Sequence, residues 1–165
     1  MLIGTHRRTL IRMSGVAALS SLYAPFYRLD IAGVSAFEIS GRAYFMMLFG
    51  QNDDVMRVIN EVTRMSSGSD LVLWIALLAF LLAGPLLIAY YAARYLIASF
   101  RPDRFSYTNP VFAVLGYAII GWLGLPVLGA HVSLQLSFTS IAGPGFWVGF
   151  PALIVGAVIG KYYHD

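Results

Sequence analysis

The sequence predicts an all-α membrane protein, a four-transmembrane-helix bundle with an external loop that carries a short hairpin and an amphipathic helix. Of its residues, 59% are hydrophobic and only 12% are charged, whereas charged residues make up about a quarter of soluble proteins. Residues 71–91 contain no charge and are long enough to cross a bilayer, which takes about 20 apolar residues of helix. Shorter apolar stretches occur at three other places. We therefore expect one integral membrane domain, 1–165, with spans at about 10–26, 71–97, 110–130 and 143–160 and an external segment at 28–70.

The first predicted span follows a cluster of arginines, as the apolar part of a signal peptide also does. No cleavage site of the small-x-small type follows, because Ala24, Pro25 and Phe26 lead directly into Tyr27. We therefore expect an uncleaved first span.

The cations next to the predicted spans indicate the orientation, because cytoplasmic loops of membrane proteins carry an excess of Lys and Arg. Such residues lie before or near the start of the first span, around the loop between the second and third, and at the end of the fourth: Arg7, Arg8, Arg12, Arg94, Arg101, Arg104 and Lys161. In the external segment, acidic residues outnumber the basic ones. We expect both termini on the cytoplasmic side of a bacterial cytoplasmic (inner) membrane. The net charge of +3 then reflects topology, and no nucleic-acid partner is expected.

The external segment divides into a predicted hairpin and a predicted helix. Residues 27–39 alternate in part between apolar and polar types around Ala32 and Gly33, which suits a short β-hairpin. From Asn52 the period changes to that of a helix with one apolar and one charged stripe. An apolar run at 44–49 precedes this helix and needs cover from the membrane interface or from a partner. The expected external contact residues are Phe45, Phe49, Val55, Ile59, Val62 and Met65.

The later spans carry two features that bear on packing. Gly84-Pro85 removes a backbone donor from the second span and predicts a kink at mid-depth. In the fourth span, small residues recur along one helix face, and close backbone approach over small residues is a main source of helix association in lipid. This face packs either within the chain's own bundle or against a separate subunit. Its residues are Gly145, Gly149, Ala152, Gly156 and Gly160.

The sequence offers little catalytic chemistry. The span interiors contain no acidic or basic residue of the kind that a proton-coupled carrier needs, although a neutral-solute pore stays open. His131, near the outer end of the third span, is the single candidate cofactor ligand, because one axial histidine beside small residues suits a chlorophyll-type pigment or a haem. The alternative is an interfacial histidine bonded to water or to Gln135. With no cysteine and no catalytic or metal-binding motif, we expect neither an enzyme nor a metal centre, and no cofactor apart from that alternative.

Three short motifs carry a resemblance. They are Ser-Ser-Leu-Tyr-Ala-Pro-Phe-Tyr at 20–27, Gly-Val-Ser-Ala-Phe-Glu at 33–38 and Gly-Pro-Gly-Phe-Trp at 143–147. In this combination the chain resembles a broad group of small uncharacterised four-span bacterial membrane proteins. The chain departs from that group in having Ala-Pro-Phe where the group has Leu-Pro-Trp, and in its longer amphipathic helix. The resemblance implies a four-span topology and carries no activity.

These observations together predict an accessory or scaffolding subunit of a larger membrane protein complex. Its expected partners are other membrane protein subunits and membrane lipids. The alternative is a module that binds or transports a lipid, a pigment or a neutral solute in a cavity at the Gly84-Pro85 kink.

Overall fold

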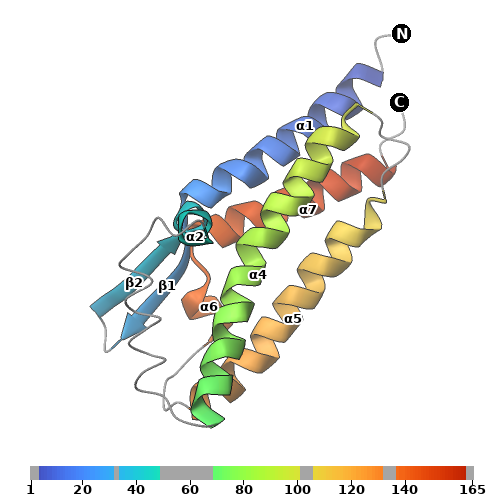
Figure 1. Ribbon diagram of the computed structural model, residues 1–165. Helices are drawn as coiled ribbons and strands as arrows, with labels where there is room; N and C mark the ends of the chain where they lie inside the picture. The colour runs from blue at the N-terminus through green and yellow to red at the C-terminus, as the bar shows by residue number, and fades with distance from the viewer. Residues whose placement is uncertain (1–3, 32–33, 49–68, 101–105, 132–136, 163–165) are drawn as a thin grey trace.

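Four long helices form the body of the part of the chain that the structure describes, which in this computed structural model is residues 4–31, 34–48, 69–100, 106–131 and 137–162. Figure 1 shows both termini at one end of this body and a β-hairpin toward the other end. The long helices are α1 (Gly4–Ser20), α4 (Ser69–Ala98), α5 (Thr108–His131) and α7 (Pro144–Tyr162).

Three of these helices are long and apolar enough to cross a membrane. The membrane-length stretches are Ile75–Ala98 in α4, Thr108–Ala130 in α5 and Pro144–Tyr162 in α7. They confirm the second, third and fourth predicted spans as apolar helices, with helix ends within two residues of the predicted ones. The protein is a multi-pass membrane protein with three candidate spans.

The first predicted span has the wrong boundaries. A helix was expected over 10–26, but α1 ends at Ser20, a single 3-10 turn covers Ser21–Tyr23, and strand β1 begins at Pro25. The α-helical region is disfavoured for a residue before proline, and Ala24 is extended, with ψ of 159°. The 17 residues of α1 reach about 26 Å, less than the roughly 30 Å of a hydrocarbon core.

The predicted hairpin is confirmed. Strands β1 (Pro25–Ile31) and β2 (Val34–Ser40) pair antiparallel across a two-residue connection at 32–33. Arg28 lies opposite Glu38, with 3.7 Å between Nε and Oε1. The hydroxyl of Ser40 accepts a hydrogen bond of 3.1 Å from the amide of Ala43 and thereby caps helix α2 (Gly41–Leu48).

The base of the hairpin is attached to the start of α7. The amide of Gly143 donates a 2.9 Å hydrogen bond to the carbonyl of Phe26, and Tyr27 forms an isolated β-bridge with Ala142. A short helix, α6 (Phe138–Ile141), begins just before α7 at a capping box. Strand β1 is therefore held against the membrane helices and does not stand free of them.

Helix α1 packs closely against both α4 and α7. Gly15 of α1 lies so near α4 that a Cβ atom there would be 3.1 Å from the carbonyl oxygen of Ala92. Tyr95 of α4 is fully buried, and its hydroxyl donates a 2.6 Å hydrogen bond to the carbonyl of Leu153 on α7. Of the apolar stretch of the remaining long helix, α5, 22% is buried, against 28% of that of α4 and 44% of that of α7.

Candidate functional site

The glycines on one face of α7 meet other parts of the same chain. A Cβ at Gly145 would lie 2.6 Å from the carbonyl oxygen of Ser21, and one at Gly149 would overlap Ser21 and Ile88. Gly156 lies against the ring of Tyr95, and Gly160 lies against the ring of Tyr107, just before α5. Ala152 is partly buried against the same core. In this structure the small-residue face is thus occupied from within the chain.

A pair of tyrosines lies beside Gly84, where a cavity had been considered. The phenolic oxygens of Tyr27 on β1 and Tyr117 on α5 are hydrogen-bonded to each other, and Tyr117 Oη donates a 3.0 Å bond to the carbonyl of Phe80. A Cβ at Gly84 would collide with both hydroxyls. Because the Tyr117 hydroxyl uses its one hydrogen in the bond to the Phe80 carbonyl, Tyr27 is the donor between the two phenols. The space at Gly84 is filled by the protein itself.

An aromatic cluster surrounds this pair. Phe146 and Phe150 lie next to each other on α7, with ring centroids 4.4 Å apart. The ring of Tyr117 lies 5.5 Å from that of Phe150 and is stacked on that of Phe80 at 4.5 Å. Phe138 of α6 packs edge-on against Phe146 at 4.8 Å. The cluster ties β1, α6 and the three membrane-length helices together.

The sequence analysis missed this cluster. Isolated tyrosines and phenylalanines in an apolar run give no periodic signal. A usable sign was present, however: a buried tyrosine hydroxyl needs a hydrogen-bond partner, and Tyr117 lies midway along an otherwise apolar span.

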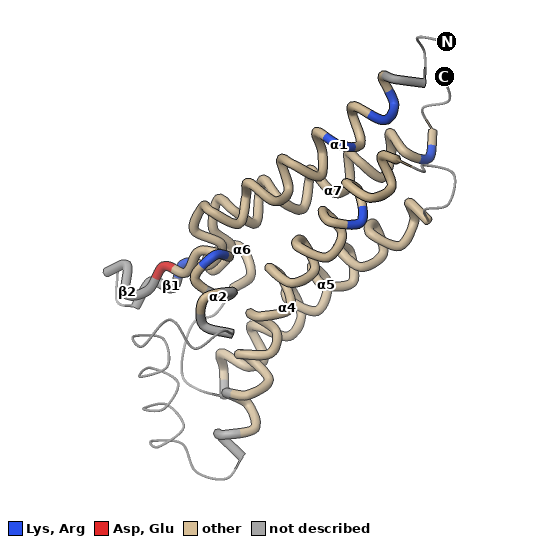
Figure 2. The backbone as a smooth tube through the Cα atoms, turned by 45° about the horizontal axis from the view of Figure 1, so that its top comes forward, with Lys and Arg blue, Asp and Glu red and all other residues tan. Residues whose placement is uncertain are grey.

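The basic residues of the four long helices gather at the end where the termini lie, as the blue segments on α1, α4 and α7 show in Figure 2. Arg7 donates to the carbonyl of Gly160 at the end of α7. Arg12 Nε lies 3.4 Å from the hydroxyl of Ser99, just beyond α4. Both arginines thus bring positive charge to the C-terminal ends of neighbouring helices, where the helix dipole favours it.

One face of α5 differs from the glycine face of α7. Phe112, Gly116, Ile120 and Gly124 follow one another at steps of four residues, and we call them the notched face. Phe112 and Ile120 are exposed, at 71% and 63%. A Cβ at Gly116 or Gly124 would meet no other atom within 4 Å. These two glycines leave open space on the outside of the bundle.

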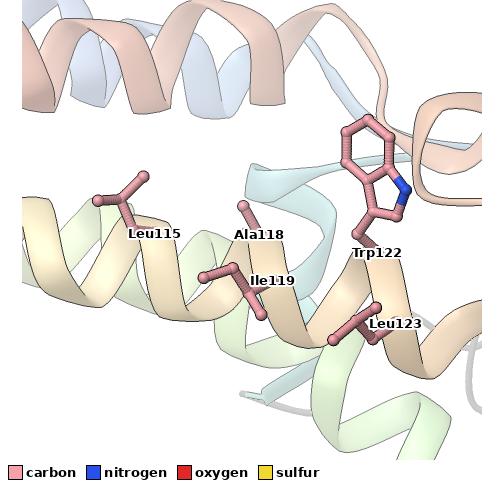
Figure 3. Close-up of a pocket in the computed structure, with 5 residues that line it drawn as sticks. All are labelled: Leu115, Ala118, Ile119, Trp122 and Leu123. Atoms are coloured by element: carbon pink, nitrogen blue, oxygen red, sulfur yellow. The ribbon is translucent and has the colours of Figure 1, made fainter.

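A second feature of α5 is an apolar groove, shown in Figure 3. It has a volume of about 260 Å³ and no polar lining. We call it the α5 groove. Its lining residues are Leu115, Ala118, Ile119, Trp122 and Leu123.

The remaining predicted site residues are only partly placed. His131 is the last residue of α5, and Phe45 lies in α2, but the orientation of neither side chain is described. Phe49, Val55, Ile59, Val62 and Met65, with the predicted amphipathic helix, lie outside the described residues. Within the described part of the chain, no three His, Asp or Glu side chains are grouped as a metal site would require.

Comparisons with protein-family models, with curated proteins and with solved structures found no match for this chain.

Proposed function

We propose that this protein is an accessory or scaffolding subunit of a larger membrane protein complex, and that the notched face of α5 is its docking surface. The observation that carries the proposal is the contrast between the glycines of two helices. Those of α7 lie against the chain's own side chains and backbone, whereas Gly116 and Gly124 of α5 lie beside open space.

Helix association in lipid supports this choice of face. Lipid tails are as apolar as leucine, so helices associate mainly through close backbone packing, and small residues permit that packing. A partner helix laid across Gly116 and Gly124 would approach the α5 backbone between the side chains of Phe112 and Ile120. The partner is thus a membrane protein that offers a helix.

The same proposal includes a four-span topology. Helix α1 lies antiparallel to α7, since Arg7 meets Gly160 at one end and Ser21 meets Gly145 at the other. A chain that crosses at α1, α4, α5 and α7 returns both termini to one side, and Figure 1 shows the two ends near each other. The excess of basic residues at this end supports a cytoplasmic location for it.

The test is a native pull-down from mild detergent with mass spectrometry of the recovered proteins. Gly116→Leu combined with Gly124→Leu fills both notches, and we expect it to abolish recovery of a defined partner. The matched control is Val148→Leu combined with Val155→Leu, because both valines are about half exposed on α7. This control should keep the partner.

The proposal fails if the wild-type chain recovers no membrane protein in defined stoichiometry. It also fails if both double variants lose the partner equally. An absorption spectrum of the same preparation tests the alternative of a pigment or haem at His131, which predicts visible absorbance.

A further inference from the structure

Three parts of the chain meet at one corner of the bundle, which we call the basic corner: Arg7 of α1, Tyr107 just before α5, and Gly160 and Lys161 of α7. The guanidinium of Arg7 donates to the Gly160 carbonyl and lies 6.0 Å from the centroid of the Tyr107 ring. Lys161 follows Gly160 directly and is exposed, with Nζ 5.0 Å from the ring centroid of Tyr162. Two cations therefore flank the last turn of α7.

The basic corner is part of a region without compensating acids. The described segments at this end of the helices are 4–12, 94–100, 106–109 and 158–162, and they contain no Asp or Glu. They do contain five basic residues, namely Arg7, Arg8, Arg12, Arg94 and Lys161. Anionic lipid headgroups attract such residues by about 1 kcal/mol per cation near the membrane surface. The charge of this end is complementary to an anionic headgroup.

Helix α5 starts at this corner, and the α5 groove lies further along the helix, toward the middle of the membrane. Leu115 is seven residues beyond Thr108 and Trp122 is fourteen beyond it, which places the groove about 10 to 21 Å along the helix. In a hydrocarbon core of about 30 Å, this is the depth of acyl chains and not of headgroups. A lining without polar atoms suits such a chain.

Lys161 lies on the side of α7 that meets α5. Phe150, Ile154, Ala157 and Lys161 follow one another at steps of four, three and four residues and so share one helix face. Phe150 on this face contacts Tyr117 of α5. In Figure 3 the groove side chains Ala118 and Trp122 point from α5 toward α7, the helix that carries Lys161.

We propose that the basic corner and the α5 groove together bind one anionic phospholipid. Its phosphate lies at Lys161 and Arg7, and one acyl chain lies along the α5 groove. The groove side chains Leu115, Ala118 and Trp122 lie on a different side of α5 from Gly116 and Gly124, so a bound lipid leaves the notched face open. The lipid site is therefore independent of any partner subunit.

The experiment is native mass spectrometry of the full-length protein from mild detergent, titrated with phosphatidylglycerol or with phosphatidylcholine of the same acyl composition. We expect one phosphatidylglycerol to be retained and phosphatidylcholine to bind more weakly. Lys161→Gln should weaken phosphatidylglycerol binding about fivefold, which corresponds to about 1 kcal/mol per cation. The matched control is Arg94→Gln, because Arg94 is an exposed cation on α4 that lies over Tyr90 instead. This control should leave binding within about twofold of wild type, since it removes a cation on α4 and leaves those of the basic corner in place.

A second variant tests the acyl chain. Ala118→Phe places a ring in the α5 groove and should lower retention of phosphatidylglycerol, while Ile120→Phe on the notched face should not. Thermal unfolding without added lipid verifies that each variant is folded. The proposal is overturned if the two lipids bind equally, if Arg94→Gln weakens binding as much as Lys161→Gln, or if Ala118→Phe has no effect. It is also overturned if inorganic phosphate binds as tightly as phosphatidylglycerol in competition, because the acyl chain would then contribute nothing.

Discussion

Tyr27 of the external hairpin and Tyr117 of membrane helix α5 share a hydrogen bond between their phenolic oxygens, although the two residues are 90 positions apart in the sequence. The hydroxyl of Tyr117 in turn donates a hydrogen bond to the carbonyl of Phe80 on α4, so one chain of hydrogen bonds joins a strand and two helices. Gly84 leaves the room that this arrangement needs. The hairpin is in this way tied to the interior of the bundle.

This arrangement predicts an energetic coupling between the two tyrosines. Tyr27→Phe and Tyr117→Phe should each destabilise the protein, and the double variant should cost less than the sum of the two. Hydrogen bonds between side chains in membrane proteins contribute about 0.6 kcal/mol on average and up to about 1.7 kcal/mol, and we expect a coupling energy in that range. A double-mutant cycle on the free energy of unfolding in detergent measures it. Tyr162→Phe, at an exposed tyrosine, is the control and should change little. Strictly additive effects would show that the phenols do not interact.

The glycines of α7 and α5 predict opposite responses to alanine. In Gly156→Ala the new Cβ would lie 2.5 Å from Tyr95 Cε2 and 2.9 Å from Ser14 Cβ. Such overpacking costs about 1–3 kcal/mol, and we expect a corresponding loss of unfolding free energy. In Gly124→Ala the new methyl group meets nothing, and alanine favours a helix over glycine by about 0.8–1 kcal/mol, so stability should hold or rise. Thermal unfolding of the isolated protein compares the two. Equal losses would mean that the α7 face is not the tighter one.

The sequence predicted the hairpin and the three apolar helices because each has a strong local signal. Ala32 and Gly33 mark the connection between two partly alternating segments, and the helices are long runs without charge. The first span was misplaced because hydropathy depends only on how apolar each residue is. It does not show that the helix ends before Pro25, or that the helix includes the charged residues Arg7 and Arg12. Here both arginines are satisfied at the ends of neighbouring helices, which is a tertiary effect.

The sequence predicted less of the candidate site than of the fold. A repeat of small residues indicates that a helix face is packed, but it does not identify the partner of that face. Only the structure shows Ser21, Tyr95 and Tyr107 against the glycines of α7. Gly116 and Gly124 were not predicted from the sequence, because what distinguishes them is the open space beside them in the structure.

The external helix predicted from the sequence gives a further prediction. If it docks by its apolar stripe, Ile59→Asp should increase protease sensitivity of the external segment and reduce recovery of a partner. Arg57→Ala combined with Glu61→Ala should do little, because an exposed ion pair contributes about 0–1 kcal/mol and a buried aliphatic side chain about 1.5–3 kcal/mol. Limited proteolysis and pull-down yield compare the two variants. Greater damage from removing the charges would contradict apolar docking.

The most direct test of the account is whether α1 crosses the membrane, because four spans and a shared side for both termini depend on it. The chain has no cysteine, so single cysteines can be labelled without background. His6→Cys and Tyr23→Cys lie at exposed positions toward the two ends of α1, and Ser106→Cys and Thr139→Cys are the matching exposed positions for the ends of the bundle. With a membrane-impermeant maleimide, we expect His6→Cys and Ser106→Cys to react only from the cytoplasmic side, and Tyr23→Cys and Thr139→Cys only from the external side. Reaction of His6→Cys and Tyr23→Cys from the same side would contradict the four-span bundle.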